Sequence, residues 1–166
     1  MEAILQTKED AKKQISVLHQ RCAETRWTRC SEMDTITKFI HPLLKALGWN
    51  ILDFNEVREE VLAKPSGKDR HMDLVLYFKG RPYIGIEIKS LSKGPVDDKT
   101  KDAVRYWIQE LLEKSRYLGV KYSVLTRFVE TIILDPKSEE KIADFNYPWG
   151  YVEKFDDLWR YLSRPV

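Results

Sequence analysis

Two short apolar runs on either side of a turn constrain the fold of this chain more than any other feature. Residues 72–78 (MDLVLYF) and 83–90 (YIGIEIKS) flank the turn at residues 79–82 (KGRP). Both runs are rich in β-branched and aromatic residues, and glycine and proline separate them. The pattern predicts a β-hairpin at the centre of the fold.

Alternation along the two strands brings charged side chains together. If the turn is centred near Gly80, Asp73 lies opposite Glu87, with roughly 5 Å between their Cβ atoms. Lys89 then shares a face with Glu87, because alternate side chains of a strand point the same way. The other face is wholly apolar and consists of Leu74, Leu76, Ile84, Ile86 and Ile88. We therefore expect two carboxylates and an ammonium to converge on one side of the hairpin.

Such a patch suits a metal-dependent phosphodiesterase. Mg²⁺ prefers oxygen ligands and commonly takes only one or two protein carboxylates, leaving places for water and phosphate. We expect Asp73, Glu87 and the carbonyl of Ile88 to bind Mg²⁺, with Mn²⁺ as a substitute. Lys89 could orient or deprotonate the attacking water, or stabilise the phosphorane. The alternative is an exposed cross-strand ion pair, but burying ionised groups in so apolar a run is costly unless they have a function.

Composition sets the class of protein. A chain of 166 residues, 43% of them hydrophobic and 33% charged, is typical of one soluble α/β domain. The net charge of +2 does not by itself indicate nucleic-acid binding, so any basic surface must be local. The apolar runs are too short to cross a bilayer, and the acidic N-terminus is unlike a signal peptide. Cys22 and Cys30 fit reduced thiols. We expect a cytoplasmic protein with no membrane partner.

A helix is expected to begin at Ser31, because Ser31-x-x-Asp34 resembles a capping box. Pro42 should kink or restart this helix, since its ring displaces a backbone hydrogen bond. Glu32 lies in the first turn, at the inner edge of the apolar stripe. An acid there either complements the helix dipole or reaches the hairpin patch as a third carboxylate, and the sequence leaves both interpretations open.

The remaining patterns complete an α/β arrangement. In chain order they predict a helix at 3–25, a strand at 51–62, a polar loop at 91–101, a helix at 103–118, strands at 122–127 and 130–134, and a helix at 155–162. The polar face of the helix at 103–118 is expected to carry Lys101, Arg105, Gln109, Lys114 and Arg116. This order predicts a mixed β-sheet with helices on both sides. We expect one domain, with a helical cover at 1–30, a core at 31–134 and a C-terminal extension at 135–166.

Three segments resemble a known nuclease family. They are residues 35–49 (TITKFIHPLLKALGW), 70–89 (RHMDLVLYFKGRPYIGIEIK) and 116–126 (RYLGVKYSVLT), in that order. Together they resemble the PD-(D/E)xK nuclease superfamily, and more narrowly the N-terminal nuclease domain of type I restriction enzyme R subunits and its stand-alone relatives. The resemblance spans most of residues 31–134. It implies a restriction-endonuclease-like sheet and a Mg²⁺-dependent DNA endonuclease that promotes in-line attack of water on phosphorus.

The resemblance also assigns roles to residues. It makes Asp73 and Glu87 the metal ligands and Lys89 the catalytic lysine, and it matches Glu32 to the acidic residue of the first core helix.

On the helix after the hairpin, Tyr117 matches a tyrosine of the family. Relatives often carry a glutamine one turn earlier, where this chain has Glu113, and Gln109 lies another turn back. Met72 also stands where the family signature has proline. Neither departure removes a metal ligand.

DNA would be held through its phosphates, in contacts that depend on salt and not on sequence. The expected contacts are Arg70, Lys93, Lys99, Lys101 and Arg105, with Gln109 and Tyr117 beside them. Nothing resembles a base-reading module, so a separate specificity or motor subunit and a homodimer stay open as partners. Two other functions also stay open: a non-catalytic nucleic-acid-binding or assembly module on the same fold, and a junction-resolving or repair nuclease.

Overall fold

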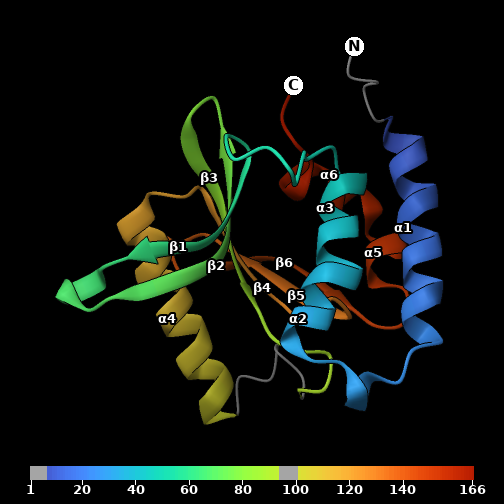
Figure 1. Cartoon of the computed structure of the whole chain (residues 1–166), viewed down its shortest axis with the longest axis horizontal. Coiled ribbons are helices and arrows are strands. Elements are labelled where there is room, and N and C mark those ends of the chain that lie inside the picture. Colours follow the sequence, from blue (N-terminus) through green and yellow to red (C-terminus); the bar gives the residue numbers. More distant parts are fainter. Residues whose placement is uncertain (1–6, 94–100) are drawn as a thin grey trace.

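Helices cover both faces of one mixed sheet (Figure 1). The computed structural model describes residues 7–93 and 101–166. The strands are β1 (Val57–Ala63), β2 (Arg70–Phe78), β3 (Arg81–Ile88), β4 (Tyr122–Thr126), β5 (Glu130–Leu134) and β6 (Lys141–Asn146). The helices are α1 (Lys8–Ala23), α2 (Glu32–Thr35), α3 (His41–Ala46), α4 (Asp102–Leu118), α5 (Gly150–Glu153) and α6 (Phe155–Leu162). The predicted α/β class is confirmed, and the arrangement is consistent with a restriction-endonuclease-like sheet.

The strands lie in the sheet in chain order, from β1 to β6. Each neighbouring pair is antiparallel except β3 and β4, which run parallel and are connected through α4. In the hairpin, Leu74 pairs with Ile86 and Val75 with Gly85. Continuing this register by one residue places Asp73 across from Glu87. The predicted hairpin is therefore present, with the predicted register.

The two faces of the sheet have separate hydrophobic cores. The larger core lies between the sheet and α1, the turn Ile36–Ile40, α3, α5 and α6, and it contains the apolar face of the hairpin. Trp49 fixes one edge of this core, since its buried ring donates a hydrogen bond from Nε1 to the Leu162 carbonyl at 2.8 Å. The smaller core lies under α4, which covers the opposite face (Figure 1). None of the described helices is both long and apolar enough to span a membrane.

The helical segment from α2 to α3 begins at the predicted capping box and is interrupted next to Pro42, as the sequence predicts. Ser31 Oγ accepts from the Asp34 amide at 2.9 Å, and Asp34 Oδ2 accepts from the Ser31 amide at 3.1 Å, which completes a capping box. A π-type turn at Ile36–Ile40 follows α2. Pro42 lies in the first turn of α3, directly after the π-type turn, and the Lys38 carbonyl that the missing N–H leaves without a helical partner accepts from Arg21 at 2.5 Å.

Thr35 connects α2 to the end of β3. Its buried hydroxyl accepts from the Leu91 amide at 3.0 Å and donates to the Ser31 carbonyl at 2.9 Å. The chain leaves β3 only three residues before Leu91. This contact places Glu32, the first residue of α2, beside the strand that carries Glu87.

The first strand begins later than predicted. The sequence indicated a strand at 51–62, whereas β1 begins at Val57 and the preceding residues form turns. Asn50 and Asp53 explain the difference, because their side chains accept from backbone amides two residues further on, at 3.2 Å and 2.8 Å. Such Asx turns satisfy the backbone without a strand partner.

The ends of the chain also differ from the expectation. The N-terminal helix was expected at 3–25, and α1 covers Lys8–Ala23 after its N-cap at Thr7, while residues 1–6 lie outside the described part. The segment 135–166 was expected to add one helix. It adds β6 at the edge of the sheet, α5 and α6. A register shift in the pairing of β5 with β6 interrupts the alternation that would have revealed β6.

Replacing Thr35 by valine tests the link between α2 and β3. Thr35→Val keeps the shape but leaves the buried Leu91 amide without an acceptor, so the free energy of unfolding should fall by ~1–3 kcal/mol. Thr37→Val is the matched control, because the Thr37 hydroxyl donates to a carbonyl on the exposed side of the same segment. Urea unfolding measures both variants. Equal losses in the two would contradict the proposed link.

Candidate active site

Asp73 is bound to the strand that carries Glu87. One of its carboxylate oxygens, Oδ2, accepts from the Ile88 amide at 2.7 Å. Ile88 is the last residue of β3 and directly follows Glu87. The hydrogen bond therefore holds the Asp73 carboxylate near Glu87, so that acids from two neighbouring strands lie close together.

Lys89 lies beside Glu87, as the alternation predicts. Its Nζ is 3.8 Å from Glu87 Oε1 and 4.9 Å from the centre of the Trp107 ring. The Lys89 side chain is 18% exposed, so the ammonium can be reached from solvent but is held by the ring. Trp107 belongs to α4, which therefore forms one wall of the site.

A second lysine contacts Glu87 from α4. Lys114 Nζ donates to Glu87 Oε2 at 2.5 Å and to the His71 carbonyl at 2.9 Å, and its side chain is only 2% exposed. The sequence placed Lys114 on the polar face of the helix, which is wrong. The signal was available, since Lys114 follows Leu111 by three residues and Trp107 by seven, spacings that put all three on one side of a helix.

Two carboxyl groups of the site, those of Glu87 and Glu32, have a raised pKa. Burial raises the pKa of Glu87 to about 7, the negative charge of Asp73 adds to the effect, and Lys114 and Lys89 oppose it. The pKa of Glu32 is also raised, first by partial burial of its carboxyl and then by Asp73, against Lys89. Glu32 therefore faces the hairpin patch, and three carboxyl groups share one electrostatic environment.

The donor set fits a hard divalent cation. Within residues 7–93 and 101–166, no three His, Cys, Asp or Glu side chains already surround a common point. Mg²⁺ does not require such a cage, because it usually keeps several waters and takes one or two carboxylates. Asp73 and Glu87 meet that requirement, and a cation between them would relieve the repulsion that raises the pKa of Glu87.

Two of the predicted DNA contacts lie near other acids around the site, Glu110 and Glu32. Arg70 Nε is 3.9 Å from Glu110 Oε1, and the same oxygen is 3.9 Å from Lys114 Nζ. Lys93 is close enough to lower the pKa of Glu32. Both cations are exposed and lie at the rim of the site.

The other predicted contacts lie elsewhere or cannot be placed. Lys99 lies outside the described residues, Lys101 immediately precedes α4, and Tyr117 is 54% exposed. Arg105 and Gln109 lie on the flank of α4 opposite to Lys114, because a helix turns by about 100° per residue. The structure does not bring these two together with the carboxylates, and their contact with DNA stays a prediction.

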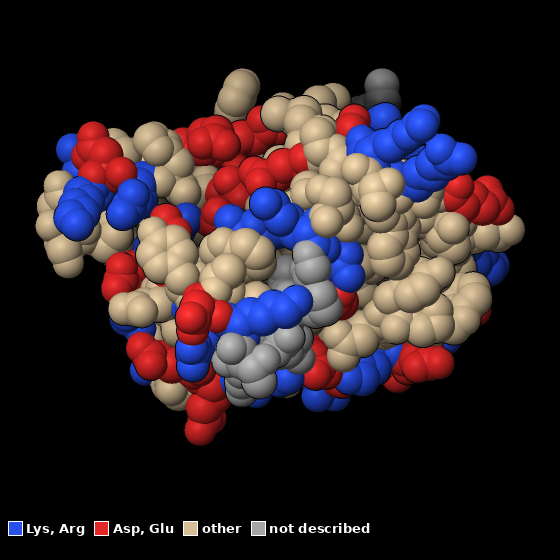
Figure 2. Space-filling model, turned by 90° about the horizontal axis from the view of Figure 1, so that it is seen from below, with Lys and Arg blue, Asp and Glu red and all other residues tan. Residues whose placement is uncertain are grey.

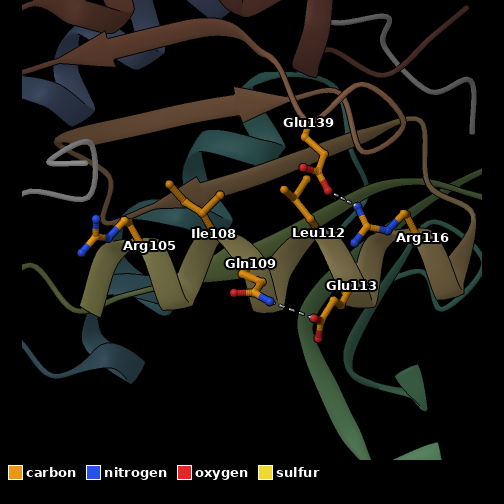
Figure 3. Close-up of a pocket in the computed structure, with 7 residues that line it drawn as sticks. All are labelled: Arg105, Ile108, Gln109, Leu112, Glu113, Arg116 and Glu139. Atoms are coloured by element: carbon orange, nitrogen blue, oxygen red, sulfur yellow. Dashed lines mark hydrogen bonds and ion pairs between the residues drawn. The ribbon is translucent and has the colours of Figure 1, made fainter. Parts of the chain in front are cut away.

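That opposite flank of α4 borders a cavity of about 430 Å³ (Figure 3). The lining residues are Arg105, Ile108, Gln109, Leu112, Glu113, Arg116 and Glu139. Gln109 Nε2 donates to Glu113 Oε1 at 3.4 Å, and Arg116 forms an ion pair with Glu139 at 2.8 Å. Gln109 therefore contacts a residue of its own helix.

The surface charge is mixed around the site. Seen from below, acidic side chains gather next to a band of basic ones, and uncharged side chains cover a wide area beyond them (Figure 2). No single basic face dominates this view. Contacts to phosphate must therefore be local, as the net charge of the chain predicts.

Comparisons with known proteins give a likeness at the level of structure. No family model matches the chain, and no curated protein matches it. A solved fragment described as an HsdR subunit of a type I restriction enzyme from Vibrio vulnificus is similar, with a TM-score of 0.48 and 19% sequence identity over 78% of this chain. This chain spans 26% of that chain's length. The roles of the site residues therefore rest on the geometry described above.

The raised pKa of Glu87 predicts a pH-dependent stability. Between its ordinary value of 4.5 and about 7, the folded protein keeps a proton that the unfolded chain releases. The contribution of Glu87 to stability therefore falls as pH rises through this window and levels off above it. In EDTA, a rise in pH through this window should lower the free energy of unfolding of the wild type, relative to that of Glu87→Gln, by on the order of 1–3 kcal/mol.

Urea unfolding from pH 4.5 to 8 measures this difference. Ile15→Val is the control, because it removes a methyl group from the buried core without changing a titrating group. Its effect on stability should be the same at every pH. A difference between wild type and Glu87→Gln that is equally flat would contradict the assigned pKa shift.

Proposed function

We propose that this chain is a Mg²⁺-dependent DNA endonuclease domain that hydrolyses phosphodiester bonds. One observation carries the proposal: Asp73 and Glu87 lie on neighbouring strands in opposed register, and Lys89 lies beside them. A fully buried apolar face behind the hairpin fixes that register. An incidental surface ion pair would not need a carboxyl with a pKa raised to about 7.

In this proposal Asp73 and Glu87 hold the cation, with the Ile88 carbonyl as a further ligand. When bound, the cation supplies a Lewis acid for the phosphoryl oxygens and for the leaving oxygen. Lys89 orients the attacking water or donates to the charge that develops on phosphorus. Trp107 holds the ammonium of Lys89 against its ring. Glu32, whose carboxyl has a raised pKa and senses Asp73, would help to orient water at the same patch.

DNA is the proposed substrate because the cations at the rim suit phosphate. Arg70 lies beside Glu110, Lys93 lies near Glu32, and both basic side chains are exposed. They would position the backbone without reading sequence. Target choice would then come from DNA structure, from a homodimer or from a separate specificity or motor subunit.

A non-catalytic nucleic-acid-binding module is the second candidate. It is favoured by the contacts of Glu87, whose two oxygens already face Lys114 and Lys89 at 2.5 Å and 3.8 Å. A carboxylate satisfied in this way could be purely structural. Titration with Mn²⁺ separates the two functions, since saturable binding that depends on Asp73 supports the nuclease and its absence supports the module.

Nicking of supercoiled plasmid tests the nuclease. Wild-type protein should nick in Mg²⁺ or Mn²⁺ and not in EDTA, because the reaction requires a cation at the carboxylates. Asp73→Asn and Lys89→Met should each reduce the nicking rate by at least ~10²-fold, the loss typical of removing a group that stabilises developing charge. Asp156→Asn is the control, since it neutralises an exposed acid on α6. Wild-type rates in both site variants, or nicking in EDTA, would show that the assignment is wrong.

The position of the basic residues predicts unequal effects on DNA binding. Lys93→Ala should weaken binding to a duplex and reduce the slope of its salt dependence by ~1, because one phosphate contact is lost. Arg105→Ala should have a smaller effect on both quantities, because Arg105 lies on the opposite flank of α4. Fluorescence anisotropy in Ca²⁺, at several salt concentrations, measures both. A larger loss in Arg105→Ala than in Lys93→Ala would place the DNA on the other side of the helix.

A further inference from the structure

The ammonium of Lys114 lies among three oxygens. Its Nζ is 2.5 Å from Glu87 Oε2, 2.9 Å from the His71 carbonyl and 3.9 Å from Glu110 Oε1. The side chain is 2% exposed, so water does not compete for these contacts. The oxygens come from three elements, β2, β3 and α4, and Lys114 is the group that they have in common.

Carboxylate and carbonyl oxygens are also the ligands that hard metal cations prefer. A lysine ammonium is a compact positive charge with three donors and no acceptor. The Lys114 ammonium therefore lies between these three oxygens in the place that a small cation would take. The position lies directly beside the candidate active site, because Glu87 belongs to both.

The contacts also divide the carboxylate oxygens of the site. Asp73 Oδ2 is held by the Ile88 amide at 2.7 Å, and Glu87 Oε2 is held by Lys114. One oxygen of each acid is thereby engaged within the protein. The two acids can then share one ion through their other oxygens, Asp73 Oδ1 and Glu87 Oε1, since the Lys89 ammonium lies 3.8 Å from Oε1, beyond hydrogen-bond distance.

We propose that Lys114 is a built-in cation that fixes Glu87 and limits the active site to a single divalent ion. Lys114 is a positioning residue, because it contacts Glu87 and not the substrate. Through the His71 carbonyl it also joins the strand of Asp73 to the strand of Glu87. This inference rests on the proposed function, because it presupposes that Asp73 and Glu87 hold an ion.

Counting bound Mn²⁺ on the whole chain tests the inference. Electron paramagnetic resonance of free Mn²⁺ should show one ion bound per chain in the wild type and none in Asp73→Asn. Lys114→Met keeps most of the length of the side chain and vacates only the place of the ammonium. This variant should bind two ions per chain, because the three oxygens then accept a cation from solution.

Thermal unfolding gives a second readout. In EDTA, Lys114→Met should unfold on the order of 10 °C lower than the wild type, because a buried carboxylate loses its partner. Mn²⁺ should raise the unfolding temperature of this variant more than that of the wild type. Lys121→Met is the matched control, since it makes the same substitution at an exposed site, and it should bind one ion.

The outcomes separate this inference from the proposed function. If the wild type and Lys114→Met each bind one ion with equal affinity, the role of Lys114 is overturned and the proposed function stands. A wild type that binds two ions has the same consequence. No Mn²⁺ bound to the wild type overturns the proposed function and this inference with it. If Lys114→Met does not fold, Lys114→Gln also removes the charge, and the same counts apply to it.

Discussion

The buried ion pair between Lys114 and Glu87 is the interaction on which the site depends. Two charges taken out of water gain little net stability when paired, but removing one partner leaves the other uncompensated at a cost of several kcal/mol. Here the pair joins α4 to β3, and the contact of Lys114 with the His71 carbonyl adds β2. A costly ion pair therefore lies at the point where the two acidic strands meet, and buried titratable groups of this kind cluster at functional sites.

Much of the fold could be predicted from local patterns. The hairpin was evident from the alternation of Leu74, Leu76, Ile84 and Ile86, because one apolar face allows only one register. The strand β6 was not predicted, since its pairing with β5 contains a register shift and its sequence shows no clean alternation. A strand was predicted around Asn50 and Asp53 where the structure has turns, because the apolar residues beside them suggested a strand while their side chains accept from the backbone.

The site was predictable where it depends on one hairpin and not where it depends on tertiary contacts. Asp73, Glu87 and Lys89 follow from alternation and register alone. The position of Glu32 depends on the hydrogen bond between Thr35 and Leu91, residues 56 apart in the chain, so the sequence left two interpretations open. The position of Lys114 was predicted wrongly, because the charge of a lysine indicated the polar face of the helix although its spacing places it in the apolar stripe.

The central claim is that Asp73 and Glu87 hold one divalent ion. Anomalous X-ray diffraction from crystals grown in Mn²⁺ tests it directly. We expect one strong peak between the two carboxylates, at about 2.1 Å from one oxygen of each, with Lys114 still bound to Glu87. The absence of a peak there, or a peak bound by Glu87 and Glu110 with Lys114 displaced, would contradict it.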